Sequence, residues 1–450
     1  MDKEVLITNF KQLERLLKPC WMRDLYYFKP IKGFSLDSRS IENGQAFIAL
    51  RGKFQDGHKF ISEAVDKGAS LVVAQRGIPG NFKIPFFLVD DTYEALKQIV
   101  CYIRKKKNPY VYGITGSVGK TTTKEMLGFL LRPAAKVLKN YKTENNLLGV
   151  GKTILALRDE EVLILELGTN SCGEIKTLGE ISYPDTGIVT FIKAVHLKGL
   201  KNLKGVFEEK ISFLERPGIK AILNKDDFYL RKVNFCKKVY WFGKGKECDL
   251  YARFIKRDLK NSIFLIQDKF KLILPMQFEG FIANVQAAML GASLYGLPLG
   301  ELVERMNSYE YSSCGRMETV KLGGVTFIND AYNANPYSFK QALGVIRRYP
   351  FKKIAVVGDM LELGGKSIYY HKLLAYDIIK SNFDYCLTIG DHASYLRDRL
   401  KELDYRRVFH FFSHQEIARF IHDKAKKGWL IFLKGSRKME LEKVMDLLKK

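Results

Sequence analysis

The sequence predicts an α/β protein of three domains, and three observations support this. The chain has 450 residues, enough for about three domains of ordinary size. Short apolar segments alternate with helical ones, which is the pattern of parallel sheets with crossover helices. One apolar segment leads directly into a glycine-rich turn and a helix, "YVYGITGSVGKTTTKEM", which is typical of a phosphate-binding loop.

Residues 1–107 form the first expected domain. It combines short strands ("AFIAL", "LVVAQ", "FFLVD") with the helical stretch "EALKQIVCYIRKKK". The charged joint "KKKNPY" follows, and proline disfavours helix at the residue before it. We therefore place the first domain boundary there.

Two further domains are expected after this joint. Between 108 and 312, strands are predicted at "YVYGIT", "VLILEL", "TGIVTFI" and "KAILN", which indicates a parallel-sheet domain of the phosphate-loop ATPase type. Between 313 and 450, "KKIAVVGD", "YCLTIGD" and "GWLIFLKG" each predict a buried strand that ends in a glycine-containing turn. This last domain is expected to be Rossmann-like, although it lacks the G-x-G-x-x-G motif.

The glycine-rich turn departs from the strict phosphate-loop pattern, because Ile114 stands where a glycine is expected. Its three glycines still allow backbone N–H groups to turn toward an anion, and the helix that follows directs its positive end to the same point. We expect Lys120 to reach the terminal phosphates and Thr121 to offer its hydroxyl to Mg²⁺.

Three more side chains are candidates for the same site. Glu166 ends a predicted strand at the edge where parallel sheets bind ligands, so it could hold Mg²⁺ or form a buried salt bridge with a structural lysine. His196 follows another strand, and Lys210 lies fourteen residues further on in an amphipathic stretch. Taken alone, His196 resembles an ordinary hydrogen-bonded histidine and Lys210 a surface charge.

Composition argues against several classes of protein. Seven cysteines without C-x-x-C spacing indicate neither a disulfide framework nor a zinc site. No apolar run reaches the ~18 residues of a membrane span, so we expect a cytoplasmic protein without membrane insertion. The net charge of +25 is spread along the chain without an RNA-reading motif, so no nucleic-acid partner is expected. A nucleic-acid-dependent ATPase is the alternative from another class.

Eight motifs, in this order, resemble the Mur ligase family: "DSRSIENGQAFIALRGKFQDGHKFI", "GITGSVGKTTTKEM", "LELGTNSCGEI", "HLKGL", "CGRME", "NDAYNANPYSF", "GDMLELG" and "LKGSRKMELEKV". The resemblance covers nearly the whole chain and is strongest to members that join D-Ala-D-Ala to UDP-MurNAc-tripeptide. It implies the three-domain Mur ligase architecture and an ATP-dependent amide ligase of peptidoglycan biosynthesis that forms an acyl phosphate. ATP and two Mg²⁺ ions are the expected cofactors, and a monomer is expected.

Two related activities are alternatives. A member that adds the third peptide residue would be expected to carry an Asp-Asn-Pro-Arg-like motif, and the sequence has none. A ligase like folylpolyglutamate synthase would be expected to carry a different motif in place of "AYNANP". The sequence does not choose between lysine and diaminopimelate as third residue of the tripeptide, and it does not define how strictly D-Ala-D-Ala is selected.

The resemblance also implies the site residues. The expected substrate contacts are Asp37, Ser38, Arg39, Asp56, Gly57 and His58 at the UDP end, with Asn145 and Asn146. The expected ATP contacts are Gly116, Ser117, Val118, Gly119, Lys120, Thr121, Thr122, Asn284, Arg316, Asp330 and Asn333. One Mg²⁺ is expected on Thr121 and Glu166 and a second on His196 and Lys210, with Lys210 carboxylated by CO₂. Lys120, His196 and Lys210 are the expected catalytic residues.

Two segments depart from the family pattern. "KTENNLLGVGK" keeps only Asn145, Asn146 and Gly149 of a longer motif, and "EGFIANVQAAML" lacks a histidine before Asn284. The expected substrate contacts of the first segment and the adenine contact of Asn284 therefore rest on reduced motifs. The roles of Lys434, Ser436 and Arg437 in "KGSR" stay open.

Overall fold

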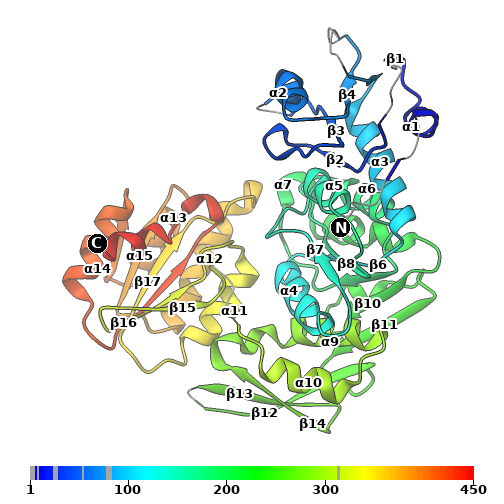
Figure 1. Ribbon diagram of the computed structural model, residues 1–450. Coiled ribbons are helices and arrows are strands. Elements are labelled where there is room, and N and C mark those ends of the chain that lie inside the picture. The colour runs from blue at the N-terminus through cyan, green and yellow to red at the C-terminus, as the bar shows by residue number, and fades with distance from the viewer. Residues whose placement is uncertain are drawn as a thin grey trace.

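The computed structural model describes residues 6–7, 10–23, 29–52, 55–77, 84–258, 260–311 and 315–449. Within them the chain builds three sheets, of five, nine and six strands, which follow one another along the sequence. Figure 1 shows the first sheet standing above the second, and the third beside it across a gap. The α/β fold class and the parallel sheets predicted from the sequence are confirmed. The boundaries at 107 and 312 stay a prediction.

The first sheet has the strand order β1-β5-β4-β3-β2. Its elements are α1 (Phe10–Leu17), β1 (Trp21–Arg23), β2 (Gly33–Ser35), β3 (Gln45–Ile48), α2 (Ile61–Asp66), β4 (Leu71–Gln75), β5 (Phe86–Val89) and α3 (Thr92–Lys107). The Asp91 side chain starts α3 by accepting hydrogen bonds from the backbone N–H groups of Tyr93 and Glu94. The helix ends at Asn108, which has the left-handed φ of 47°. The predicted helix into the charged joint is thus confirmed.

Helix α3 is fastened to the second sheet by a buried arginine. Arg104 is 4% exposed and donates to the backbone oxygens of Ser182 and Tyr183, each at 3.1 Å. Its guanidinium also lies 3.2 Å from the carboxylate of Asp185, which accepts a hydrogen bond from the Val111 backbone at the start of the central strand. A charged donor with several acceptors makes strong hydrogen bonds, so this residue joins two domains.

Replacing that arginine should weaken the junction. Arg104→Ala is expected to lower the free energy of unfolding by about 2–3 kcal/mol, because hydrogen bonds to a charged donor are lost and the carbonyl group of the buried Ser182 loses its partner. Lys105→Ala, on the exposed side of the same helix, is the matched control and should change it by less than about 0.5 kcal/mol. Urea unfolding of the two variants checks this. Equal stabilities would contradict the role of Arg104.

The second sheet has the order β14-β13-β12-β11-β10-β9-β6-β8-β7. Its strands are β6 (Tyr110–Thr115), β7 (Val137–Lys139), β8 (Val162–Glu166), β9 (Thr186–Val189), β10 (Lys220–Asn224), β11 (Lys238–Gly243), β12 (Leu250–Arg257), β13 (Asn261–Ile266) and β14 (Phe270–Pro275). Its helices are α4 (Lys120–Leu131), α5 (Leu147–Leu155), α6 (Glu174–Ser182), α7 (Leu197–Leu200), α8 (Leu203–Ile211), α9 (Ile282–Leu294) and α10 (Leu299–Asn307). The four strands predicted here are confirmed.

The position of β6 determines where the site forms. It lies between β8 and β9 and pairs with both in parallel, so the carboxyl ends of all three strands meet at one edge. The antiparallel strands β12 to β14 extend the sheet at its far end and were not predicted. They lie well away from this edge in Figure 1.

The third sheet has the order β15-β16-β20-β17-β18-β19 and is parallel except for the β15–β16 pair. Its elements are β15 (Glu318–Leu322), β16 (Val325–Asn329), α11 (Pro336–Ile346), β17 (Lys353–Gly358), α12 (Ser367–Lys380), β18 (Tyr385–Ile389), α13 (Ala393–Glu402), β19 (Val408–Phe411), α14 (His414–Lys424), β20 (Leu430–Lys434) and α15 (Lys443–Leu448).

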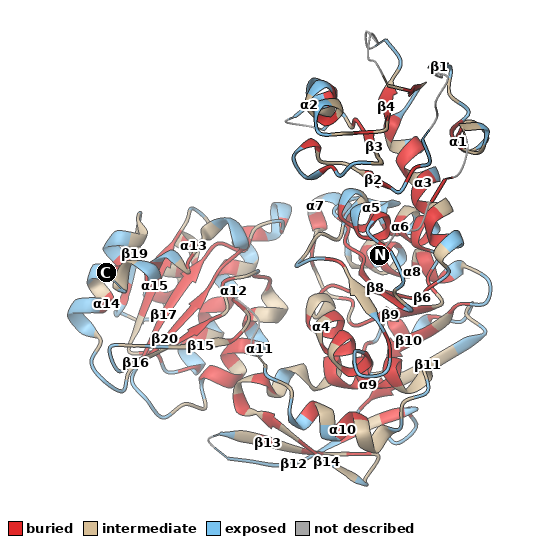
Figure 2. Ribbon diagram, in the orientation of Figure 1, coloured by how far each residue is buried: buried red, intermediate tan, exposed pale blue. Residues whose placement is uncertain are grey.

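Helices cover both faces of this third sheet. Along β17, Ala355 and Val357 pack into the core with α11, α12 and α13, while Ile354 and Val356 pack into the core with α14 and α15. Because alternate residues of a strand point to opposite faces, both faces are apolar and the strand is buried, as Figure 2 shows. This is the doubly wound arrangement expected of a Rossmann-like domain. No helix in the described part of the chain is long and apolar enough to cross a membrane.

Candidate active site

The turn between β6 and α4 has the backbone that a phosphate loop needs. Gly116 has φ +147°, and a Cβ there would lie 2.0 Å from the hydroxyl of Thr190. Gly119 has φ +84° and precedes the first residue of α4. The Ser117 backbone N–H donates to Phe191 at 2.7 Å, which fixes the turn against the end of the neighbouring strand. The N-terminal end of α4 therefore faces the sheet edge, where an anion is stabilised.

Thr121 and Glu166 meet at this edge. The carboxylate of Glu166 is 1% exposed and accepts from the Thr121 hydroxyl and from the Asn145 side-chain amide, each at 2.7 Å. The Nζ of Lys124 lies 3.9 Å from the same carboxylate, so the structure has both features that the sequence left open, a ligand position beside Thr121 and a buried lysine. A hydroxyl and a carboxylate are ligands that Mg²⁺ prefers.

The ammonium of Lys120 is held within the loop. Its Nζ donates to the backbone oxygen of Gly116 at 3.0 Å. Burial lowers the pKa of Lys120, although the nearby Glu166 carboxylate opposes this. A phosphate in the loop would offer this ammonium a charged partner in place of one carbonyl oxygen.

His196 and Lys210 occupy different surroundings. His196 lies beyond β9, and its Nδ1 is 2.8 Å from the Glu362 carboxylate of the C-terminal domain. Lys210 is completely buried, and its Nζ has no hydrogen-bond partner within the described residues. Burial first, and the Lys120 ammonium second, hold the pKa of Lys210 well below its usual value. The interpretation of Lys210 as surface charge is therefore wrong.

The surroundings of Lys210 fit its expected carboxylation. Burial lowers the pKa of Lys210 and so favours the free amine, which is the form that reacts with CO₂. A buried amine without a partner among the described residues is also an orphaned polar group, which is rare in folded proteins. Among the described residues, no group of three or more His, Cys, Asp and Glu side chains gathers as a metal site.

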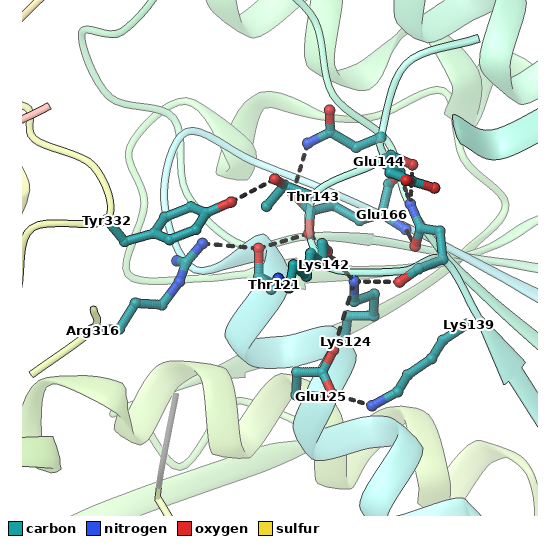
Figure 3. A network of polar contacts seen from close by, with 12 residues as sticks. Thr121, Lys124, Glu125, Lys139, Lys142, Thr143, Glu144, Glu166, Arg316 and Tyr332 are labelled. Atoms are coloured by element: carbon teal, nitrogen blue, oxygen red, sulfur yellow. Dashed lines mark hydrogen bonds and ion pairs between the residues drawn. The ribbon is translucent and has the colours of Figure 1, made fainter. Parts of the chain in front are cut away.

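The C-terminal domain contributes side chains from across the gap. Arg316 donates to the Thr121 hydroxyl at 3.0 Å, and the Tyr332 hydroxyl is 2.5 Å from that of Thr143, as Figure 3 shows. Behind them, the buried Lys434 ammonium donates to the Asp330 carboxylate at 2.5 Å and to the Asn333 backbone oxygen at 3.1 Å. Lys434, whose role the sequence left open, thus fixes two of the expected ATP contacts.

These groups surround one cavity of about 630 Å³. The predicted residues that line it are Ser117, Val118, Gly119, Lys120, Thr121, Thr122, Asn145, Asn146, Glu166, His196, Asn284, Arg316, Asp330 and Asn333, together with Lys434, Ser436 and Arg437. Gly116 and Lys210 are buried and are not among the lining residues. The Asn284 amide donates to the Gly119 backbone oxygen and the Thr123 hydroxyl, so its nitrogen is engaged by the phosphate loop and α4.

The substrate residues predicted in the N-terminal domain lie outside this cavity. Asp37 accepts from the Arg39 backbone and guanidinium, which lowers the pKa of Asp37 to about 2. Ser38 donates to Glu63, and the Asp56 carboxylate is 2.5 Å from Nδ1 of His58. A Cβ on Gly57 would lie 2.7 Å from the Leu50 oxygen, so this turn requires glycine. The role of these six residues toward UDP stays a prediction.

Several side chains of the site were not singled out from the sequence. Asn140 accepts from the Glu166 backbone N–H at 2.9 Å and donates to the Glu166 oxygen, yet nothing in its sequence context marks it. Tyr332 lies in the motif "NDAYNANP" and Glu362 in "GDMLELG". Their place in these motifs is the sequence signal that could have identified them as site residues. Lys124 resembles an exposed helical lysine, although α4 is buried on nearly all sides.

Comparison with known proteins agrees with this geometry. Family descriptions match in three consecutive parts: "Mur ligase family, catalytic domain" over residues 30–115, "Mur ligase middle domain" over 114–292, and "Mur ligase, glutamate ligase domain" over 315–437. The UDP-N-acetylmuramoyl-tripeptide--D-alanyl-D-alanine ligase of Bacillus subtilis is 30% identical, over 97% of this chain and 98% of that one.

Solved structures are similar over the same length. A crystal structure of MurF from Acinetobacter baumannii has a TM-score of 0.90 at 29% identity, with both chains fully covered. MurF ligase from Thermotoga maritima in complex with ADP has a TM-score of 0.84 at 27% identity, covering 93% of this chain and 97% of that one. Fold and site define a ligase built around a nucleotide-phosphate loop. The chain belongs to the Mur ligase family.

Proposed function

We propose that this protein joins D-Ala-D-Ala to UDP-N-acetylmuramoyl-tripeptide at the expense of ATP. The observation that carries the proposal is the meeting of Lys120, Thr121 and Arg316 in one cavity, where a side chain of the C-terminal domain contacts the glycine-rich turn and the start of α4. The names of the similar ligases from Bacillus subtilis and Acinetobacter baumannii support the choice of substrates. As expected from the sequence, we propose a cytoplasmic monomer.

The proposed chemistry proceeds in two steps. A carboxylate is a poor electrophile toward an amine, so the free carboxylate of the tripeptide attacks the γ-phosphorus of ATP, and ADP leaves. The neutral amine of D-Ala-D-Ala attacks the carbonyl carbon of the acyl phosphate. The tetrahedral intermediate collapses, phosphate leaves with the former carboxylate oxygen, and the amine loses its proton.

The residues of the chain act mainly by position and charge. Lys120 would turn from the Gly116 oxygen to the transferred phosphoryl group and neutralise its charge. Arg316, held 3.0 Å from Thr121, would stabilise the same group from the C-terminal domain. Thr121 with Glu166, and His196 with carboxylated Lys210, would hold two Mg²⁺ ions. Bound there, the ions would supply positive charge to the phosphates.

The experiment measures ADP formation with ATP, Mg²⁺ and UDP-MurNAc-tripeptide carrying either lysine or diaminopimelate, with and without D-Ala-D-Ala. We expect sustained ADP formation only with the tripeptide and the dipeptide together, and preference for one tripeptide defines the third residue. No turnover with either tripeptide would contradict the proposal. ATP hydrolysis stimulated by DNA or RNA alone would instead favour the nucleic-acid-dependent alternative.

A further inference from the structure

Helix α4 carries a second lysine that the proposed chemistry does not use. Lys124 lies one helical turn beyond Lys120, and its side chain is completely buried. Its ammonium donates to the backbone oxygen of Asn140 at 2.7 Å and of Lys142 at 2.5 Å. A buried charge is costly unless it is paired and hydrogen-bonded, so an ammonium kept at this position requires these partners.

The two carbonyl groups belong to a loop that connects β7 with α5, residues 140–146. Figure 3 shows this loop crossing above α4, with Lys124 reaching it from below. Lys142 in the loop has the left-handed φ of 44°, which is uncommon for lysine. The backbone oxygen of Lys142 accepts the hydrogen bond from Lys124, which therefore supports a backbone conformation that is uncommon for lysine.

Three residues of the same loop form hydrogen bonds with Glu166 or with the C-terminal domain. Asn140 bonds the backbone of Glu166 through both its side-chain oxygen and its side-chain nitrogen. Asn145 donates to one Glu166 carboxylate oxygen, while Thr121 donates to the other. Thr143 contacts Tyr332 of the C-terminal domain. A displacement of the loop would therefore move the Glu166 carboxylate and a contact between domains together.

Among the described residues, Lys124 supplies the one ammonium within 4 Å of that carboxylate. It lies 3.9 Å from the Glu166 carboxylate and 3.6 Å from that of Glu125. Glu125 in turn forms an ion pair with Lys139, the last residue of β7 before the loop. Two adjacent residues of α4 thus fasten the loop at its start.

We propose that Lys124 is a positioning residue for the ligase reaction. It fixes loop 140–146 to α4, the helix at the phosphate loop. In this way it holds the Glu166 carboxylate in position beside the Thr121 hydroxyl. Lys124 is completely buried and is not one of the residues that line the cavity, so it would not contact a substrate bound there. The inference rests on the proposed function, because the position of Glu166 relative to Thr121 affects the rate only if phosphoryl transfer occurs at this site.

Lys124→Met tests it, because methionine keeps most of the apolar stem and removes the ammonium. We expect kcat to fall about 100-fold, the loss that a displacement of about 1 Å can cause, while the KM for D-Ala-D-Ala changes less than about twofold. Lys353→Met is the matched control. Lys353 is 3% exposed and donates to the Tyr349 backbone oxygen in the C-terminal domain, away from the cavity, so kcat should stay within about twofold.

A double-mutant cycle with Asn140→Ala distinguishes positioning from a general loss of stability. If Lys124 acts through the loop, the double variant should be no more than about threefold slower than Lys124→Met alone, because both changes release the same carboxylate. Effects of the two changes that multiply would overturn the inference. So would a kcat of Lys124→Met within about threefold of the unmodified protein, or an equal loss in Lys353→Met at equal melting temperature.

The experiments also distinguish misfolding of Lys124→Met from a failure of the proposed function. If Lys124→Met does not fold, Lys124→Gln replaces it, since an amide still donates to a carbonyl oxygen. For Lys124→Gln we expect kcat to fall about tenfold, with the same coupling to Asn140→Ala. An unchanged kcat overturns the inference. If the unmodified protein forms no ADP with both substrates, the proposed function fails. Activity in the unmodified protein and in Lys124→Met alike rejects only the positioning role.

Discussion

Lys210→Ala is expected to lose activity by about 1000-fold and to regain part of it when acetate or formate is added. A carboxylated lysine would carry a negative charge and two oxygens near the second Mg²⁺, whereas alanine offers none. A small carboxylic acid can enter the space left behind and stand in for these oxygens. The rate of ADP formation is measured at increasing acetate concentrations, and we expect it to recover along a saturation curve.

Controls for this result come from the same residue and the same helix. Lys210→Arg should stay inactive with and without acetate, because a guanidinium keeps its positive charge and does not take up CO₂. Lys204→Ala, whose side chain is 78% exposed on α8, should keep its activity. In the unmodified protein, ¹³C-labelled CO₂ should give a carbamate signal in NMR that Lys210→Ala lacks. Lys210→Ala with near-normal rates in CO₂-depleted buffer would show that the buried lysine has no catalytic role.

The second large effect concerns the phosphate loop. Lys120→Ala should reduce kcat to below about a hundredth of normal, because a preorganised charge on the transferred phosphoryl group contributes on the order of 10²–10³ in rate. The melting temperature without ligands should change little, since within the described part of the chain the Lys120 ammonium donates to a single carbonyl oxygen, in its own loop.

Lys176→Ala, on the exposed side of α6, serves as control for a lost lysine near the same sheet edge and should be fully active. If Lys120→Ala keeps more than a tenth of the activity, the proposed role of the phosphate loop in phosphoryl transfer is wrong.

Elements with a strong local pattern were predictable from the sequence. The strand β6 has the predicted bounds of 110–115, because a buried parallel strand is continuously apolar, and α4 begins at Lys120, directly after the glycine-rich turn that marked its start. The three antiparallel strands β12 to β14 were missed, since they lie at the far end of the sheet and outside any motif.

The candidate site was predictable where a motif carried it. Thr121, Glu166 and Arg316 come together in one cavity, as their motifs suggested. The burial of Lys124 and Lys210 was not predictable, because helical lysines are usually exposed and only the packing of neighbouring elements covers these two. The pairing of His196 with Glu362 depends on how two domains meet, which a sequence pattern does not specify.

The central claim is that the protein activates a carboxylate as an acyl phosphate before forming an amide bond. The most direct test uses UDP-MurNAc-tripeptide with ¹⁸O in its free carboxylate, together with ATP and D-Ala-D-Ala, and analyses the products by mass spectrometry. The account predicts UDP-MurNAc-pentapeptide with one ¹⁸O retained in the new amide and one ¹⁸O in each released phosphate. Pentapeptide accompanied by unlabelled phosphate, or phosphate released without pentapeptide, would contradict it.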